Sequence, residues 1–366
     1  MKYYLIAGEA SGDLHGSNLV RALKKPGDEI LAWGGDEMEA AGATIVKHYR
    51  ELAFMGFVEV LMNLRTIMRN LTFCKKDILA HKPDVLILID YPGFNLRIAK
   101  WAKAQGIKVI YYISPQVWAW KENRVKSMRT CIDLMLVILP FEKKYFHDKW
   151  NWDVEYVGHP LVEVVNRHLA STPAPALSNK KIIAVLPGSR KQEILKKLPV
   201  MLEVSKSFPD YQFIVARAPG LDSSFYESIQ KNYPDVMAVT GKTYDLLRQS
   251  EAALVTSGTA TLETALFGVP EVVCYKGNYI SYQIGRRVIK VKYISLVNLI
   301  MDRPVVTELI QNEMNVENVK RELDMILNNK ARREKMLGDF RTLREMLQQG
   351  EDASSKAAGL ILKNLA

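Results

Sequence analysis

Short apolar runs alternate with longer helical patterns along most of this chain of 366 residues. The run Val85–Ile89 is apolar at every position, which is typical of a parallel strand that is covered on both faces. Helical segments such as Asn95–Gln105 separate these runs, and the alternation predicts βαβ units in an α/β sheet. The strands predicted in the first half are Tyr3–Ala7, Ile30–Gly34, Val85–Asp90, Val109–Ile113 and Leu134–Leu139.

A proline-rich, unpatterned stretch, Ser171–Ala176, is predicted to link two domains. We expect a domain at residues 1–169 and another at 177–339, both Rossmann-like and doubly wound, facing a central cleft that receives the carboxyl ends of the strands. The segment from about Val316 is helical and charged, and helices at about 340–366 are expected to complete the first domain. The strands predicted in the second series are Ile182–Leu186, Gln212–Ala216, Met237–Val239, Ala253–Thr256 and Val272–Tyr275.

Composition narrows the class of protein. No apolar stretch approaches the ~20 residues that span a bilayer, and the first apolar run meets Glu9 and Asp13 at once, so we interpret it as a core strand and not as a signal peptide. The three cysteines are far apart and lack metal-ligand spacing, which is typical of buried thiols in a reducing compartment. The net charge of +10 suits nucleic acid, anionic lipid or a phosphorylated small molecule, and composition does not choose among them.

The loop after the first strand, Gly8–Gly16, is rich in small residues and precedes a predicted helix at Ser17–Lys25. It matches neither the dinucleotide-binding glycine motif nor a P-loop. Its glycines, including Gly12, permit a close backbone approach, and the helix N-terminus favours an anion or hydroxyl. A tight turn in which Ser11 or Asp13 caps the helix remains the alternative, whereas Glu9 is placed at the strand tip.

Asp90 is predicted to end a wholly apolar strand, where a carboxylate is costly to bury unless it is solvated, paired or used in chemistry. Its place at the carboxyl edge of the sheet suits a general base, and a structural loop cap is the alternative. Asn95 is expected to cap the next helix. After the following strand, Trp118 and Trp120 either stack on a sugar or pack under a helix, and packing is slightly favoured.

Two loops of the second domain can bind an anion. In Gly188-Ser189-Arg190 the guanidinium is suited to phosphate oxygens. In Ser257–Thr261, which includes Gly258 and Thr259, small residues and a helix N-terminus favour a phosphate. Glu263 can accept hydrogen bonds from ribose hydroxyls or belong to a capping arrangement. Because the chain has no D-x-D, H-E-x-x-H or zinc-spaced Cys/His motif, we expect no metal and no cofactor.

In this order, the loops resemble those of the lipid-A-disaccharide synthases, which are inverting GT-B glycosyltransferases. The likeness spans nearly the whole chain. The matching stretches are Gly8–Asp13, Met55–Leu61, Asp90–Asn95, Ser114–Trp120, Leu139–Glu142, Gly158–Pro160, Leu186–Arg190, Ser257–Glu263 and Tyr293–Ile300. Val297 departs from the family's usual proline, so that turn is expected to be less rigid.

The resemblance implies a reaction between UDP-2,3-diacylglucosamine and 2,3-diacylglucosamine-1-phosphate (lipid X). The products are a β-1,6-linked disaccharide-1-phosphate of lipid A biosynthesis and UDP. It implies that Asp90 deprotonates the acceptor, with Glu9 as the second candidate for the base. Residues matched to the binding of substrate or UDP are Ser11, Gly12, Gly188, Ser189, Arg190, Ser257, Gly258, Thr259, Thr261, Glu263, Asn298, Glu308 and Gln311.

Acylated substrates imply contact with a membrane, at the inner face of the cytoplasmic membrane of a Gram-negative bacterium. Apolar residues recur at helical spacing from Phe57 to Leu71, which predicts either acyl-chain contact or an ordinary buried helix face. The basic segment Tyr279–Tyr293 is a second candidate for lipid contact, or else a solvated face. The residues proposed for lipid contact are Met55, Phe57, Leu61, Leu64, Met68, Arg286 and Arg287.

Two rival functions remain at this point. The first is another GT-B enzyme, such as a UDP-N-acetylglucosamine 2-epimerase or a peptidoglycan-type N-acetylglucosaminyltransferase; an epimerase needs no lipid acceptor. The second is a non-catalytic nucleotide- or nucleic-acid-binding protein, against which the scattered basic residues argue, so no nucleic-acid partner is expected. A homodimer and the acyl-chain length are left open.

Overall fold

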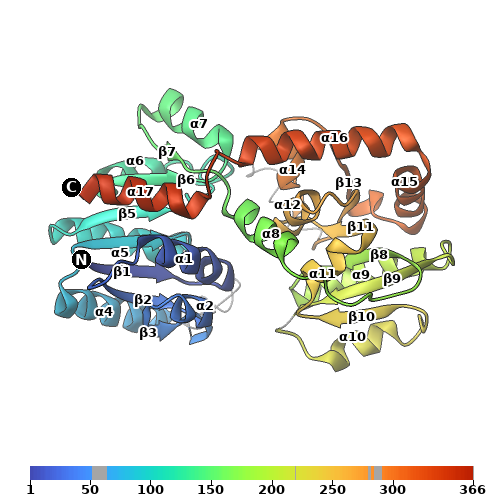
Figure 1. Cartoon of the computed structure of the whole chain (residues 1–366), viewed down its shortest axis with the longest axis horizontal. Coiled ribbons are helices and arrows are strands. Elements are labelled where there is room, and N and C mark those ends of the chain that lie inside the picture. Colours follow the sequence, from blue (N-terminus) through green and yellow to red (C-terminus); the bar gives the residue numbers. More distant parts are fainter. Residues whose placement is uncertain (52–63, 219, 279–281, 284–290, 366) are drawn as a thin grey trace. The chain divides into compact units, whose positions relative to one another are not determined.

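The computed structural model describes residues 1–51, 64–218, 220–278, 282–283 and 291–365. The chain divides into two compact units (Figure 1). Unit 1 comprises Met1–Pro160 and Leu347–Ala366, and unit 2 comprises Leu161–Met346.

Unit 1 contains a seven-stranded parallel sheet with the strand order β3-β2-β1-β4-β5-β6-β7. The order reverses between β1 and β4, and at such a switch point the loops after two neighbouring strands separate and leave a binding position. The strands are β1 (Lys2–Ala7), β2 (Glu29–Gly34), β3 (Thr44–His48), β4 (Val85–Ile89), β5 (Lys108–Tyr112), β6 (Leu134–Val137) and β7 (Glu155–Tyr156).

Each face of this sheet carries its own hydrophobic core because side chains alternate along a strand. On β1, Tyr4 and Ile6 belong to one core, whereas Tyr3, Leu5 and Ala7 belong to the other. The C-terminal helix contributes to the second core, so it completes unit 1 as a structural element. The helices of unit 1 are α1 (Ala10–Leu23), α2 (Asp36–Ala40), α4 (Leu64–His81), α5 (Pro92–Ala104), α6 (Arg124–Cys131), α7 (Pro140–Trp150) and α17 (Ala353–Leu365), with a 3-10 turn at Tyr49–Glu51.

Unit 2 repeats this architecture with a six-stranded parallel sheet in the order β10-β9-β8-β11-β12-β13, whose switch point lies between β8 and β11. The strands are β8 (Lys181–Leu186), β9 (Tyr211–Arg217), β10 (Met237–Thr240), β11 (Ser250–Thr256), β12 (Glu271–Tyr275) and β13 (Thr307–Ile310). The helices are α8 (Pro160–Ala170), α9 (Lys191–Ser205), α10 (Ser223–Gln230), α11 (Thr243–Arg248), α12 (Thr259–Leu266), α14 (Leu296–Met301), α15 (Val316–Asn328) and α16 (Lys330–Leu347), with a 3-10 turn at Gln311–Glu313.

The division between the units falls at Pro160, earlier than the expected domain end at residue 169. Helix α8 therefore belongs to unit 2, and the contacts of His168 explain why. This side chain forms an ion pair with Asp245 at 3.1 Å and an edge contact with the ring of Phe267. The proline-rich stretch 171–176 follows α8 inside unit 2 and does not separate the two units.

Local boundaries also differ from the sequence expectations. Helix α1 begins at Ala10 and not near Ser17, so Ser11, Gly12 and Asp13 are helical. Three strands, β3, β7 and β13, were not predicted. All three lie at sheet edges and are only partly buried, so their sequences lack the continuous apolar pattern of central strands.

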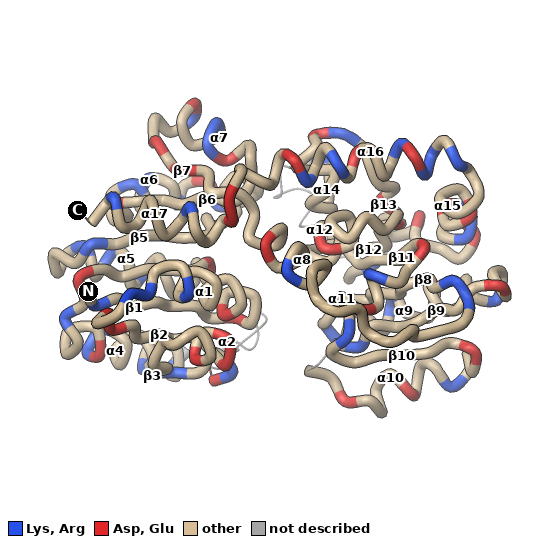
Figure 2. Tube along the Cα trace, in the orientation of Figure 1, with Lys and Arg blue, Asp and Glu red and all other residues tan. Residues whose placement is uncertain are grey.

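Within the described part of the chain, no helix is both long enough and apolar enough to span a bilayer. Lys and Arg are interspersed with Asp and Glu on the helices of both units (Figure 2). Cys74, Cys131 and Cys274 are buried free thiols.

Candidate functional site

Glu9 and Asp90 occupy the switch point of unit 1. Because Ala7 pairs with Ile89, the residues that follow β1 and β4 emerge side by side at the carboxyl edge of the sheet. Glu9 is the N-cap residue of α1, yet its side chain makes no capping hydrogen bond and it is exposed. The structure therefore brings together the two carboxylates that the sequence singled out.

The backbone at Asp90 is strained and held in place. Asp90 and Tyr91 have φ values of 45° and 50°, a left-handed conformation that is costly for residues other than glycine. The buried amide of Asn95 donates to the carbonyl oxygens of Ile89 and Asp90 at 3.2 and 2.8 Å, and the Tyr111 hydroxyl donates to the Asp90 carbonyl at 2.6 Å. Asn95 thus secures the turn that presents the Asp90 carboxylate.

Glycine at position 8 allows this turn to form. A Cβ atom at Gly8 would overlap the ring of Tyr91, so a larger residue would push the Asp90 turn away from the end of β1. The need for glycine comes from close packing, because the backbone at Gly8 does not have a positive φ.

Burial, and to a smaller extent the nearby Glu9 carboxylate, together raise the pKa of Asp90 to about 6. Desolvation and a like charge both disfavour the ionised form of a carboxyl group. A carboxyl group with a pKa near the working pH can accept a proton and release it again, as a general base must. The geometry therefore suits Asp90 for abstracting a proton from a hydroxyl group.

Asp13 has a structural role in a neighbouring element. Its carboxylate accepts hydrogen bonds from the backbone N–H groups of Gly35, Glu37 and Met38 at 2.7, 3.1 and 3.1 Å. Asp13 therefore caps the N-terminus of α2, and the expectation that it caps the helix following its own loop is wrong, because it lies inside α1. Ser11 is exposed and Gly12 is buried in the first turn of α1.

The two tryptophans of the loop after β5 have different environments. Trp118 packs edge-on against Phe141, and its Nε1 donates to the buried Glu142 carboxylate at 3.1 Å. Burial raises the pKa of Glu142 to about 7, while its hydrogen bonds oppose that rise. Trp120 is 46% exposed, and the Lys121 ammonium lies 4.2 Å from the centre of its ring. Packing thus accounts for Trp118, and Trp120 is free to meet a ligand.

In unit 2, the loops after β8 and β11 meet at the second switch point. Gly188 has a φ of 100°, and a Cβ atom there would lie 3.1 Å from Cγ2 of Thr256. Ser189 is exposed, and Arg190, whose side chain is 71% exposed, donates to Glu193 at 3.2 Å. Gly258, with a φ of 137°, precedes α12, whose first residue Thr259 is exposed. The predicted anion loops are therefore neighbours, and an accessible guanidinium lies beside them.

Glu263 lines a hollow of about 380 Å³ in unit 2. Its Oε1 accepts a hydrogen bond from the Tyr244 hydroxyl at 2.7 Å, and burial raises its pKa. The hollow is lined by residues of α8, the loop after β10, α11 and α12, namely His168, Gly241, Lys242, Thr243, Tyr244, Asp245 and Glu263.

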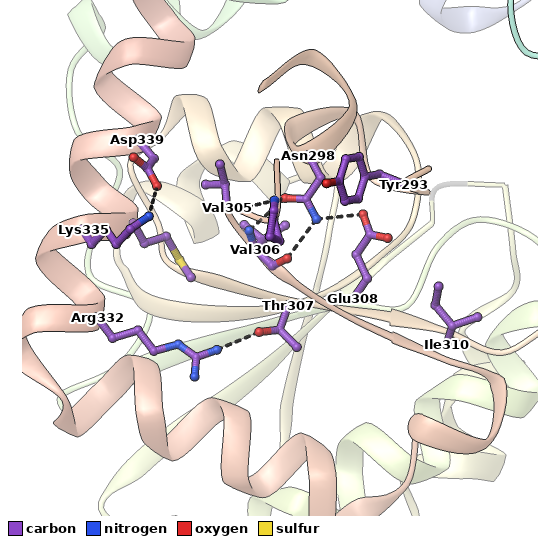
Figure 3. Close-up of a pocket in the computed structure, with 12 residues that line it drawn as sticks. Tyr293, Asn298, Val305, Val306, Thr307, Glu308, Ile310, Arg332, Lys335 and Asp339 are labelled. Carbon is purple, nitrogen blue, oxygen red and sulfur yellow. Dashed lines mark hydrogen bonds and ion pairs between the residues drawn. The ribbon is translucent and has the colours of Figure 1, made fainter. Parts of the chain in front are cut away.

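The buried Asn298 and the half-buried Glu308 form a hydrogen-bonded cluster in the lining of a pocket of about 520 Å³ (Figure 3). The Asn298 amide donates to Val306 O and Glu308 Oε1 and accepts from the N–H groups of Val305 and Val306, all at 2.8 to 2.9 Å. Glu308 also accepts from Ile294 N and from Ser295 N and Oγ, at 2.7 to 3.2 Å. These groups are satisfied within the protein, so their observed contacts hold the turn before α14.

That turn reaches the anion loop. Ser257 Oγ donates to the Ile294 carbonyl at 2.8 Å, which joins the loop after β11 to the Asn298 cluster. Thr261 is fully buried, and its hydroxyl donates to the Gly258 carbonyl at 2.8 Å, so in this structure it closes the first turn of α12. Gln311 accepts from Gly277 N at 3.2 Å.

Comparisons with known proteins agree on one family. A family model described as lipid-A-disaccharide synthetase matches residues 3–362. The lipid-A-disaccharide synthase of Geobacter metallireducens is 39% identical over 372 residues, covering 99% of this chain and 96% of that protein. The synthase of Syntrophus aciditrophicus is 40% identical over 375 residues, covering 98% of each. The chain belongs to the lipid-A-disaccharide synthase family.

Solved structures support the same fold for this family member. The glycosyltransferase of kitacinnamycin superposes with a TM-score of 0.68 at 15% identity, covering 100% of this chain and 99% of that one. A Staphylococcus aureus MnaA–UDP complex gives 0.69 at 13% identity, with coverages of 100% and 97%. These likenesses concern the fold alone. The expected GT-B class, with Rossmann-like units, is confirmed, and membership of the synthase family makes the chain a hexosyltransferase.

Several residues predicted for this synthase-family site lie beyond the described ranges or keep an untested role. Met55, Phe57, Leu61, Arg286 and Arg287 lie outside the described residues, and only the backbone of Leu64 is described. Met68 is 57% exposed, whereas Ile67 and Leu71 pack on the core. Part of the apolar stripe is therefore an ordinary buried helix face, and part remains exposed. In the described ranges, no group of three or more His, Cys, Asp or Glu residues is arranged to hold a metal. Metal independence stays a prediction.

Sequence reasoning missed Lys197 and Tyr244, and it noted Glu142 only as part of a motif. A signal for Lys197 exists, because it falls on the apolar face of α9 beside Ile194, Leu198 and Met201. A lysine on such a face is buried only when it has partners. No comparable pattern marks Tyr244, which lies in the short helix α11.

Proposed function

We propose that this chain transfers 2,3-diacylglucosamine from its UDP derivative to the 6-hydroxyl of lipid X, in lipid A biosynthesis. The acceptor oxygen bonds to the anomeric carbon of the donor as the bond to UDP breaks. The proton of the hydroxyl passes to a carboxylate, and UDP leaves with the bonding electrons. Attack from the side opposite the leaving group inverts the anomeric centre and forms the β-1,6 linkage.

The observation that carries this proposal is the carboxylate pair of unit 1 in a member of this family. Asp90 lies in a held turn at the switch point, and its pKa is raised to about 6 by burial and by Glu9. A group that is ionised near neutral pH yet still basic suits proton removal from a sugar hydroxyl during attack. Glu9 is exposed and its side chain makes no capping hydrogen bond, which suits orientation of the acceptor.

Unit 2 supplies groups suited to the donor. The exposed Arg190 can donate two parallel hydrogen bonds to phosphate oxygens, and the N-terminus of α12 directs N–H groups toward the same loop. The hollow beside Glu263 offers carboxylate and hydroxyl groups for a ribose. We propose that these groups, without a metal ion, stabilise the charge of the departing UDP. Asn298 and Glu308 would act by holding the Ser257 loop, since their polar atoms are engaged within the protein.

The function is tested by incubating the purified protein with UDP-2,3-diacylglucosamine and lipid X in the presence of EDTA. Mass spectrometry is expected to show equal amounts of UDP and disaccharide-1-phosphate, and UDP-N-acetylglucosamine in place of the acylated donor is expected to give none. Failure to form disaccharide under conditions where UDP binds would contradict the substrates proposed here. Activity that returns only with added Mg²⁺ would contradict metal independence.

We further propose that α4 contacts the inner face of the cytoplasmic membrane. Its exposed positions include Met68, Phe73 and Leu79, at 57%, 45% and 48% exposure. Arg65, Arg69 and Lys76 lie among them, and no acidic residue occupies an exposed position of α4 in the described range. Apolar and basic side chains on one helix face are typical of peripheral binding to anionic lipid. The α4 face is defined here by Arg65, Met68, Arg69, Phe73, Lys76 and Leu79.

Exchanging Met68 and Leu79 for serine should weaken binding to phosphatidylglycerol vesicles by about tenfold, because apolar surface is no longer transferred from water to the bilayer. Co-sedimentation with vesicles measures this change. The matched control exchanges Leu195 and Met237, two exposed apolar residues of unit 2, for serine. Equal vesicle binding by both variants and the wild type would show that the α4 face is not the contact.

A further inference from the structure

A lysine ammonium is buried at the switch point of unit 2. Lys197 lies on α9 and its side chain has no exposed surface. Its Nζ donates a hydrogen bond to Thr256 Oγ1 at the end of β11. The same nitrogen lies 3.5 Å from the position that a Cβ atom of Gly188 would occupy. The positive charge therefore lies next to both anion loops.

Glu193 connects this buried charge to the exposed Arg190. One carboxylate oxygen accepts from Arg190 Nη1 at 3.2 Å, and the other accepts from Lys197 Nζ at 3.3 Å. Two cations thus share one carboxylate, which leaves the group with a net charge of about +1. Burial lowers the pKa of Lys197, and the Glu193 carboxylate opposes that change.

We propose that Lys197 is a positioning residue for the diphosphate of the donor: by pairing with Glu193 it leaves Arg190 available to phosphate oxygens. This inference rests on the proposed function, because it takes the ligand of these loops to be a nucleoside diphosphate. It concerns the phosphates alone, since the Glu263 hollow, proposed for the ribose, is lined by other residues.

The Glu193 carboxylate and the donor phosphates compete for Arg190, and this competition explains why a buried cation beside Glu193 is useful. Without Lys197, the Glu193 carboxylate would have Arg190 as its remaining ion-pair partner among the described contacts. A guanidinium engaged by a carboxylate loses donors for phosphate, and the group becomes neutral overall. The hydrogen bond to Thr256 additionally ties α9 to the strand that leads into the Ser257 loop.

The test compares Lys197→Met, Glu193→Gln and the double variant with the wild type in the full chain. Calorimetry measures affinity for UDP, and displacement of UDP measures affinity for uridine. Lys197→Met is expected to weaken UDP binding about tenfold or more and to change uridine binding little, because only the phosphates use Arg190. Methionine fills a similar volume without a charge, and because Glu193 is partly exposed and keeps its ion pair with Arg190, the exchange leaves no fully buried charge unpaired.

Glu193→Gln in the Lys197→Met background is expected to restore most of the UDP affinity, because the competing carboxylate is gone. Lys196→Met, at an exposed neighbouring position, is the matched control and should bind UDP as the wild type does. Unchanged UDP affinity in Lys197→Met, or a loss that Glu193→Gln does not restore, would overturn the inference. A wild type that binds neither UDP nor uridine would instead overturn the proposed function.

Discussion

Asparagine in place of Asp90 is expected to lower kcat for disaccharide formation by roughly 10²–10⁴-fold, the usual contribution of a general base. The amide has the shape of the carboxyl group but cannot accept the proton of the acceptor. Asparagine also tolerates the left-handed backbone found here at φ 45°, so the turn held by Asn95 should persist. Turnover with both substrates saturating, together with calorimetric UDP affinity, measures the effect.

The exposed Asp153 of unit 1 provides a matched control, and Asp153→Asn should retain full activity. A wild-type level of turnover in Asp90→Asn would exclude Asp90 as the base. Loss of UDP affinity in parallel with turnover would instead indicate a disturbed fold.

The pH profile separates the roles of the two carboxylates. Because the base must be ionised, kcat/KM of the wild type should fall as the pH decreases through about 6, the raised pKa of Asp90. Glu9 contributes to that elevation, so Glu9→Gln should move the midpoint to lower pH while activity at high pH is largely kept. Loss of activity at every pH in Glu9→Gln, with Asp90→Asn active, would make Glu9 the base.

Alanine in place of Asn298 is expected to lower the free energy of unfolding of unit 2 by about 2–4 kcal/mol. The change removes four hydrogen bonds at once and leaves the buried N–H groups of Val305 and Val306 without their acceptor. Glu308 loses one donor as well. Differential scanning calorimetry should show a transition lowered by roughly 5–10 °C.

Asn312→Ala, at an exposed position of the 3-10 turn Gln311–Glu313 in the same unit, is the matched control and should melt as the wild type does. If Asn298→Ala melted normally but bound UDP poorly, Asn298 would contact the donor directly, as the family resemblance implies. A lowered transition temperature would support the holding role that we propose.

The central strands could be predicted because burial on both faces leaves a pattern in the sequence. Every residue of Val85–Ile89 is buried, and the corresponding run is wholly apolar. The edge strands β3, β7 and β13 are half-exposed and carry mixed residues, so no such pattern marks them. Helix α8 was assigned to the wrong unit because its sequence shows an apolar face but not which surface covers that face.

The candidate site divides in the same way. Loop residues such as Asp90 and Arg190 could be found because polar groups directly after apolar strands fall at the carboxyl edge of a parallel sheet. The hydrogen-bond partners of polar residues could not be found in this way. Asp13 caps α2, and Asn298 accepts from a backbone N–H group of a later turn. The sequence does not say which side chains a fold brings within hydrogen-bond distance.

By itself, the sequence determined the α/β class, the two Rossmann-like series and the family, since these depend on periodicity and on short motifs in a fixed order. The tertiary structure decided which polar residues can still bind a ligand and which are hydrogen-bonded within the protein. The Glu9 side chain makes no capping hydrogen bond, Asp90 is held in a strained turn beside it, and Lys197 is buried next to the anion loops. These states depend on desolvation and on partners distant in the chain, and both arise only when the sheets and helices pack.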